Sequence, residues 1–330
     1  MDRRQFSGGL AALCMAIAGC RRNGPETESD ADQQPLNVVA TVGMVADLVR
    51  QIGGERVQVT QLMGSGVDPH LYKATRDDLR LLMQADVIVA VGLLLEGRLQ
   101  EVLAKLKSTC RVVFAADQIP AELLLTSEES GGHPDPHVWM DVEAWSHCLA
   151  GIASALSAER PQYAAEFDSR ARELAFELQG LHAYGVQSVA TIPQDRRVLI
   201  TSHDAFRYFG RAYSLEVMGI QGISTESEAG LLQVNALVDL LVQRRISAVF
   251  IESSVPQKNI AALIEGAQAR GHQVSIGGEL YSDAMGEQGT WEGTYPGMLD
   301  HNITTITRSL GGQVPERGWA ELRLQTGVQP

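Results

Sequence analysis

Short apolar runs rich in β-branched residues alternate with longer amphipathic segments along most of the chain. The first half contains such runs at 37–42, 57–63, 86–92 and 111–115, and the second half at 197–201, 215–219, 248–252 and 273–277. Helical periodicity fills several of the gaps, most clearly at 44–53, 76–85 and 231–244. Buried strands that alternate with helices are typical of parallel βαβ units, so we predict an α/β fold with parallel sheets flanked by helices.

One longer helical pattern separates the two halves. Its apolar residues recur at spacings of three and four, which places them on one face of a helix: Tyr163, Phe167, Ala171, Leu174, Leu178 and Leu181. A helix over 161–190 would be on the order of 45 Å long. We therefore predict a lobe at 37–160, a rigid linking helix at 161–190 and a second lobe at 191–330, with a site in the cleft between the lobes.

The first residues are typical of a targeting segment rather than of the folded body. Arg3 and Arg4 precede an apolar stretch too short to span a bilayer, which ends in small residues before Cys20. This pattern resembles a bacterial lipoprotein signal at 1–19, with Cys20 lipidated, and the polar stretch at 20–36 then forms a flexible tether. The Arg pair favours twin-arginine export, with an ordinary secretion signal as the alternative. We expect an exported protein anchored by lipid at the extracytoplasmic face of a bacterial membrane.

Composition excludes some functions and leaves others open. The formal net charge is −13 and the chain lacks basic blocks, which argues against binding to nucleic acid. Beyond Cys20 the chain contains Cys110 and Cys148, which lack the spacing of a metal or redox motif. A disulfide between them is compatible with export, but we expect two buried free thiols.

Four residues follow the ends of predicted strands and have side chains that ligate metals: His70, His137, His203 and Asp283. Ligands of parallel sheets gather at the carboxyl ends of the strands, so residues from both halves can converge there. Three imidazoles and one carboxylate are a suitable ligand set for Zn²⁺ or Mn²⁺. The alternative is that each is an ordinary loop residue, and that Asp283 caps a helix.

The tripeptide Asp-Pro-His occurs twice, ending at His70 and at His137. Proline restricts its own backbone and that of the preceding residue, so each imidazole would project from a stiff corner. Asp68 and Asp135 are then placed to accept a ring N–H or to cap the turn. We expect Tyr72, Trp139 and Tyr281 to shield the site from water.

The other histidines lack this setting. His133, in a Gly-rich loop, is a candidate for holding or delivering metal. We interpret the remaining four as structural: His147, His182, His272 and His301.

These residues lie in segments that resemble the cluster A-I (cluster-nine) metal-binding lipoproteins of bacterial manganese/zinc ABC importers. The similar segments include "DPHLYKATRDDL", "DPHVWMD", "ITSHDAFRYFG" and "LYSDAMGEQGTWEGTYPGMLDHNI", and they spread over almost the entire body. The resemblance implies two α/β lobes bridged by one long helix, with His70, His137, His203 and Asp283 as ligands of one divalent ion. It also implies an ABC permease and its ATPase as partners, and we expect a monomer.

The resemblance leaves the metal open. Some manganese-binding members have Glu at the third position, where this chain has His203, and three-His members are described as binding both zinc and manganese. Many zinc-dedicated members carry a long His-rich loop, which here is shortened to "TSEESGGHPDPH".

Three function classes follow. The leading hypothesis is a solute-binding lipoprotein, not an enzyme, that captures Mn²⁺ or Zn²⁺ for an importer. A zinc-dependent hydrolase would use the same ligands, but it normally keeps one coordination position open for water. A surface adhesin of the same family is the third class, and no sequence feature supports it independently.

Overall fold

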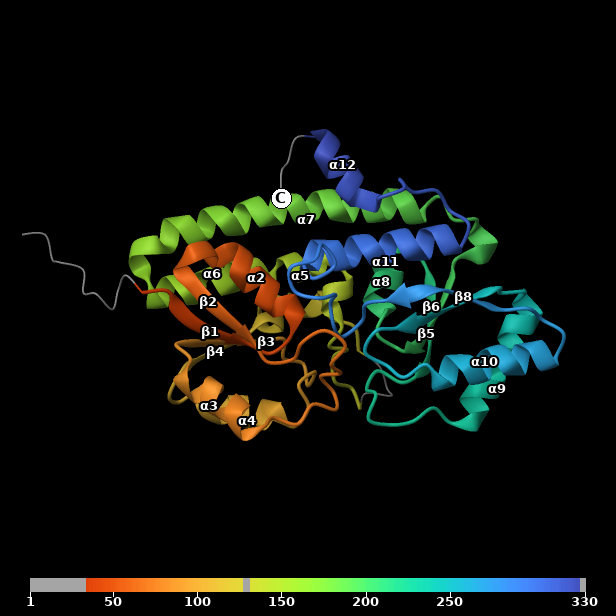
Figure 1. The fold of residues 1–330 in the computed structure, drawn as a ribbon, viewed down its shortest axis with the longest axis horizontal. Coiled ribbons are helices and arrows are strands. Elements are labelled where there is room, and N and C mark those ends of the chain that lie inside the picture. The colour runs from red at the N-terminus through yellow and green to blue at the C-terminus, as the bar shows by residue number, and fades with distance from the viewer. Residues whose placement is uncertain (1–33, 127–130, 327–330) are drawn as a thin grey trace, which may run out of the picture. The chain divides into compact units, whose positions relative to one another are not determined.

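A computed structural model describes residues 34–126 and 131–326. The predicted signal at 1–19, Cys20 and nearly all of the predicted tether lie outside these residues. The folded body is α/β, as predicted, with every paired strand parallel to its partner. Figure 1 shows the first four strands on one side of the body and the later strands on the other.

The first half forms one four-stranded sheet in the order β2-β1-β3-β4. Its strands are β1 (Leu36–Ala40), β2 (Val57–Gln61), β3 (Val87–Ala90) and β4 (Arg111–Phe114). The buried residue Val38 lies in the middle of the sheet, opposite Val59 on one side and Val87 on the other. Strand β1 starts one residue inside the predicted tether, because Leu36 is already fully buried.

The second half contains two parallel pairs, β5-β6 and β7-β8, with β5 lying beside β7. The strands are β5 (Val198–His203), β6 (Glu216–Gln221), β7 (Ala248–Glu252) and β8 (Ser275–Leu280). Each corresponds to a predicted strand, with ends shifted by up to three residues. His203 was expected after its strand, but it is the last residue of β5, where it pairs with Gln221.

Helices surround both sets of strands. Those of the first half are α2 (Gly43–Gly53), α3 (Arg76–Gln84), α4 (Leu99–Leu106), α5 (Val142–Ser146) and α6 (Cys148–Glu159). The second half contains α8 (Arg207–Tyr213), α9 (Leu231–Arg244), α10 (Lys258–Ala269), α11 (Tyr295–Ser309) and α12 (Gly318–Thr326). His301 lies in α11.

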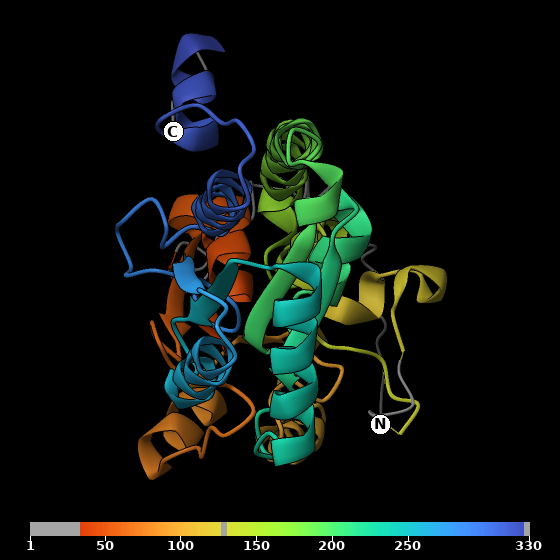
Figure 2. The same ribbon diagram turned by 90° about the vertical axis from the view of Figure 1, so that its right-hand side faces the viewer.

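The predicted long helix is present as α7 (Ala164–Val189), preceded by a single 3₁₀ turn over Pro161–Tyr163. Its apolar stripe is buried from Phe167 to Leu181, whereas Tyr163 lies in the 3₁₀ turn and is partly buried. Helix α7 packs against α2, α5 and α6 of the first half and against α8 and α11 of the second. Figure 2 shows α7 in green and α11 in blue end-on and side by side. One helix thus braces elements from both halves.

Two apolar cores hold these layers together. The larger one includes the first sheet and continues beneath α7, α8 and α11, while the smaller one lies between β5, β7, α9 and α10. Cys148 is buried and Cys110 is partly exposed, and both thiols are free, so only one of the two is fully buried as expected. Among the described residues, no helix combines the length and apolarity that a membrane crossing requires.

Candidate metal centre

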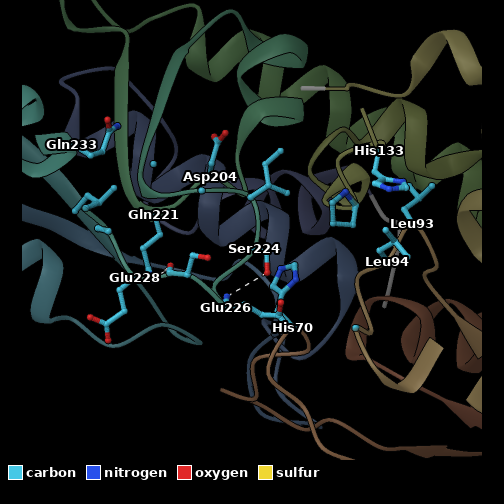
Figure 3. A pocket seen from close by; sticks show the side chains of 18 of the residues that line it. His70, Leu93, Leu94, His133, Asp204, Gln221, Ser224, Glu226, Glu228 and Gln233 are labelled. Carbon is cyan, nitrogen blue, oxygen red and sulfur yellow. Dashed lines mark hydrogen bonds between the residues drawn. The ribbon is translucent and has the colours of Figure 1, made fainter. Parts of the chain in front are cut away.

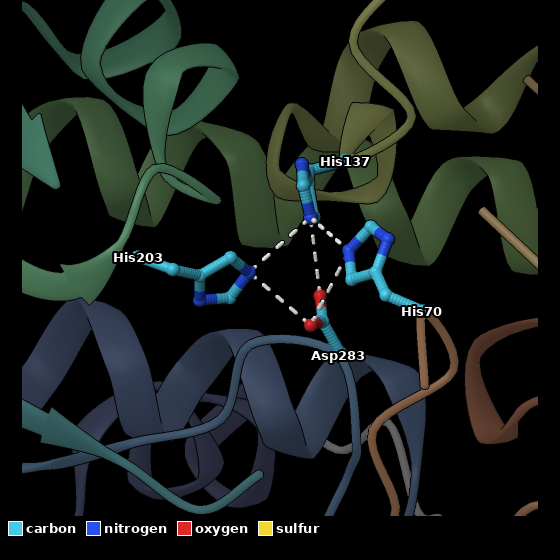
Figure 4. A group of neighbouring side chains, drawn as sticks. All are labelled: His70, His137, His203 and Asp283. Carbon is cyan, nitrogen blue, oxygen red and sulfur yellow. Dashed lines mark hydrogen bonds and ion pairs between the residues drawn. The ribbon is translucent and has the colours of Figure 1, made fainter. Parts of the chain in front are cut away.

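Four side chains that are far apart in the sequence converge on one point (Figure 4). They are His70, His137, His203 and Asp283, and each offers one ligating atom within 4.8 Å of the others. His70 projects from the loop between β2 and α3, and His137 lies immediately before the 3₁₀ turn Val138–Met140. His203 ends β5, and Asp283 lies three residues beyond β8. The structure therefore brings together all four candidates predicted from the sequence.

Most of the distances between these atoms are those expected between ligands of one metal ion. The Nε2 atom of His137 lies 3.3 Å from Nε2 of His70 and 3.4 Å from Nε2 of His203. Asp283 places Oδ1 3.2 Å from His137 Nε2, and Oδ2 3.2 Å from His203 Nε2 and 3.7 Å from His70 Nε2. Tetrahedral ligands at about 2.0–2.1 Å from a central ion lie about 3.3–3.4 Å from one another. Four of the five distances fall close to this range, so these side chains can share one divalent transition metal ion.

Asp283 is enclosed without the hydrogen bonds that a buried carboxylate needs. It is 1% exposed, and neither of its oxygens accepts a hydrogen bond of good geometry from the described residues. A buried charge is normally stabilised by a counter-charge or a metal ion. Burial by itself raises the pKa of Asp283, but the facing His203 and His137 outweigh it and hold the pKa well below its usual range. Asp283 is therefore an anion aimed at the three imidazoles.

The imidazoles differ in their affinity for protons. Burial lowers the pKa of His70 to about 4. Burial also opposes protonation of His137, but Asp135 and Asp283 raise its pKa to about 9. For His203, Glu252 and Asp283 likewise outweigh burial and raise the pKa well above its usual value. A metal ion at this point would therefore displace protons from His137 and His203.

The second Asp-Pro-His corner fixes its imidazole directly. Asp135 is fully buried, and its Oδ1 lies 2.7 Å from Nδ1 of His137 and accepts the backbone N–H of the same residue at 3.0 Å. This contact places the proton on Nδ1 and directs Nε2 toward the site. Asp135 therefore fulfils both roles considered from the sequence.

The first corner differs, although its sequence is the same. Asp68 Oδ1 accepts the backbone N–H of His70 at 2.9 Å, which caps the turn. Its Oδ2 accepts the hydroxyl of Thr225 at 2.6 Å, across 157 residues of sequence. Asp68 thus holds the His70 loop against the second half of the chain and has no recorded contact with the ring of His70.

Glu252 is a functional residue that the sequence analysis missed. It ends β7, is 2% exposed, and lies beside His203. Its Oε1 accepts the backbone N–H of His203 at 2.8 Å, and its Oε2 forms a short but bent ion-pair contact of 2.6 Å with His203 Nδ1. Its position at the end of a predicted strand could have identified it, because the four candidates were selected for their positions at or after strand ends.

The loop that carries Asp283 is anchored on both sides. Asn302 of α11 accepts the backbone N–H of Tyr281 at 3.0 Å and donates to its carbonyl at 2.7 Å. Trp139 donates its indole N–H to the Ser282 carbonyl at 3.0 Å. Asp283 does not cap a helix, because the segment after it is irregular.

The three predicted shielding aromatics have different environments. Trp139 is fully buried and its ring packs edge-on against His137 at 5.3 Å between centroids, as expected. Tyr72 is only partly buried and its hydroxyl donates to Asp78, and Tyr281 is partly buried with its ring against His301. Of these three aromatic residues, Trp139 is therefore the one whose ring packs against a histidine of the cluster.

The remaining histidines lie outside the cluster of four ligating atoms. His272 and His301 contact the carbonyls of Ile246 and Glu279 through Nε2, His182 packs on Tyr213, and His147 is exposed. His133 is exposed and lines a neighbouring cavity instead.

This cavity, of about 910 Å³, reaches the cluster from one side (Figure 3). Among the four clustered residues, only His70 lines it. His70 is 6% exposed, whereas His137 and His203 are fully enclosed. Four acidic residues line its wall, Glu101, Asp204, Glu226 and Glu228, against one Lys or Arg residue, Arg98. The cavity therefore offers a cation a route to the cluster past His70.

Comparison with known proteins agrees with this geometry. Residues 38–309 match the family described as zinc-uptake complex component A, periplasmic (ZnuA). The chain is 47% identical to the manganese-binding lipoprotein MntA of Bacillus subtilis, over 93% of this chain and 99% of that protein. It is also 47% identical to the zinc-binding protein TroA of Treponema pallidum, over 94% of this chain and 99% of TroA.

Solved structures show the same similarity. The periplasmic zinc-binding protein TroA superposes with a TM-score of 0.81, over 84% of this chain and 99% of that one. The α/β architecture with parallel sheets and the buried cluster of histidines and aspartate are thus accompanied by extensive sequence identity. The chain belongs to the ZnuA family of metal-binding proteins.

Proposed function

We propose that this protein is the solute-binding component of an ABC importer and that its substrate is a divalent transition metal ion, Mn²⁺ and/or Zn²⁺. The ion is held by Nε2 of His70, His137 and His203 and by the carboxylate of Asp283. The single observation that carries the proposal is the buried cluster of four side chains whose ligating atoms lie within 4.8 Å of one another, with Asp283 lacking a hydrogen bond of good geometry. The MntA and TroA relatives, named for manganese and zinc, support the same substrate class.

The ligand set suits capture better than catalysis. A catalytic zinc normally has three protein ligands and keeps a fourth position for water, whereas this site supplies four donor atoms. A closed shell retains an ion without activating a water molecule. We therefore propose a binding protein and not a hydrolase.

Residues around the site orient its imidazoles and guide cations toward it. Asp135 and Glu252 orient His137 and His203 through Nδ1, which leaves Nε2 free for the ion. Nitrogen-rich sites bind Zn²⁺ more tightly than Mn²⁺. Affinity alone does not decide which ion is carried in the cell, because the supply of each ion and the choice made by the permease also contribute. The acidic wall of the cavity attracts cations toward His70.

The partners and the location of this protein are part of the same proposal, and its family membership supports them. We propose an importer permease and its ATPase as partners, and a monomeric receptor that is exported and anchored through a lipid on Cys20. One relative named as a manganese-binding lipoprotein and another named as a manganese ABC transporter substrate-binding lipoprotein support this location. The lobe boundaries 37–160 and 191–330, with the linking helix at 161–190, belong to the same proposal.

Metal uptake by cells tests the delivery step. A strain that lacks its own copy of this protein is complemented with wild type, with His137→Ala or with His272→Ala, and accumulation of radioactive Mn²⁺ and Zn²⁺ is measured. We expect wild type and His272→Ala to restore uptake of at least one ion, and His137→Ala to fail at equal protein level. Uptake restored equally by His137→Ala would refute the proposal.

A further inference from the structure

The contact between Thr225 and Asp68 connects the most exposed ligand to the wall of the cavity. We propose that Thr225 is a positioning residue, and that its hydrogen bond to Asp68 is a latch that sets the rate at which the ion leaves past His70. This inference rests on the proposed function, since it assumes that His70 holds an ion.

Asp68 uses its two oxygens for two separate tasks. Through Oδ1 it holds the backbone of His70, and through Oδ2 it accepts the Thr225 hydroxyl at 2.6 Å. Thr225 is 8% exposed and Asp68 is partly buried, so the contact is partly shielded from water. A short hydrogen bond to a carboxylate is stronger than one between neutral groups, and its loss is correspondingly more costly. The position of His70 is thereby coupled to the position of Thr225.

Thr225 belongs to the segment between β6 and α9 that forms one wall of the cavity. Its neighbours on both sides line this wall: 221–224 and 226–230. Figure 3 labels Ser224, Glu226 and His70 among the residues that line this cavity. Inside the segment, Gln221 donates to the Ser227 carbonyl at 3.0 Å, and the Glu226 N–H donates to Ser224 Oγ at 3.3 Å. The contact with Asp68 adds an attachment to the other half of the chain.

The two Asp-Pro-His corners therefore have different functions. Asp135 directs both of its recorded side-chain hydrogen bonds to His137, its own corner residue. Asp68 directs one to its own corner and the other to Thr225. Breaking the Thr225 contact releases the loop of His70 and the cavity wall together, while His137, His203 and Asp283 keep their own attachments. The expected consequence is faster release of the ion with unchanged coordination.

Release kinetics of the full-length chain in detergent test the latch. Protein loaded with one equivalent of Zn²⁺ is mixed with an excess of a chromogenic chelator, and the dissociation rate is measured by stopped flow. The variants are Thr225→Val, which removes the hydroxyl at similar volume, Thr225→Ser, which restores it, and Thr225→Ala as a second deletion. Thr109→Val is the matched control, because Thr109 is exposed and its hydroxyl donates only to the Leu106 carbonyl in the recorded contacts.

We expect dissociation to be about tenfold faster or more in Thr225→Val and Thr225→Ala, from the usual contribution of a hydrogen bond to a charged group. Thr225→Ser and Thr109→Val should release the ion at the wild-type rate. The absorption spectrum with bound Co²⁺ should be the same in all variants, which separates a latch from a distorted ligand set.

Each other outcome has a distinct meaning. If Thr225→Val and Thr225→Ala bind one ion and release it at the wild-type rate, the latch is refuted and the proposed function stands. If Thr225→Ser is as fast as Thr225→Val, the hydroxyl is not the reason and the latch is also refuted. If wild-type protein binds no ion, the proposed function fails, and the latch fails with it.

Discussion

Replacement of Glu252 by glutamine tests whether the residue behind His203 contributes to metal binding. Glu252 offers two acceptor oxygens to two donors of His203, the backbone N–H at 2.8 Å and Nδ1 at 2.6 Å. Glutamine has one acceptor and one NH₂ group, so it can satisfy only one of these donors. The second donor would then face the NH₂ group of the glutamine. His203 could avoid this contact only by moving its proton from Nδ1 to Nε2, the atom that must bind the ion. Both alternatives weaken metal binding.

The magnitude follows from the role of such supporting residues. Loss of a carboxylate that orients a ligating histidine typically reduces metal affinity 10–100-fold, about 1.4–2.7 kcal/mol. The enclosure of Glu252, at 2% exposed, places the expected loss toward the upper end of this range, because water cannot replace the missing acceptor. We therefore expect the Kd for Zn²⁺ to rise by about 30-fold or more.

The assay is a competition titration with a chelator of known affinity, on full-length protein stripped of metal. Glu159→Gln is the matched control, since Glu159 pairs with Arg111 at the surface, away from the site. Its Kd should equal that of wild type. A Glu252→Gln variant that remains folded and binds Zn²⁺ within twofold of wild type would show that Glu252 does not contribute to metal binding.

Three further predictions concern other parts of the chain. Phe167→Ala should lower the free energy of unfolding by about 3–5 kcal/mol, because this fully buried ring anchors α7, while Phe176→Ala on the exposed face should have little effect in the same denaturant titration; equal effects would contradict the packing of α7. His133→Ala should retain one tight metal ion per chain by equilibrium dialysis, because His133 lies outside the four-residue cluster, and loss of that ion would show that the ligand set is wrong. Changing Arg3→Lys together with Arg4→Lys should block export, measured by cell fractionation, and unchanged export would favour the ordinary secretion signal.

Much of the fold could be predicted because buried strands and helices leave strong local patterns. The ends of strands were less certain, as β8 shows. The prediction stopped at Gly277, but the strand continues to Leu280, and a Cβ at Gly277 would lie 2.8 Å from the ring of Phe250. The glycines, which resemble a loop in the sequence, permit close packing within the strand.

The four clustered residues could be predicted because the carboxyl ends of parallel strands converge. Their supporting residues were harder to identify, because these roles depend on partners distant in the sequence. Asp68 and Asp135 have the same local sequence, yet only the fold places Thr225 beside Asp68. Glu252 was missed because it ends an otherwise apolar, fully buried strand and gives the impression of a core position.

A competition titration of metal-free, full-length protein with Zn²⁺ and Mn²⁺, in wild type and in His137→Ala, tests metal capture by the four clustered residues. His137 is the residue of the cluster that lies near all three others, with its Nε2 at 3.2–3.4 Å from atoms of His70, His203 and Asp283. We expect one tight site per chain in wild type and its loss in His137→Ala, and the ratio of the two affinities will rank the metals. Absence of a tight site in wild type, or a site of unchanged affinity in His137→Ala, would contradict this expectation.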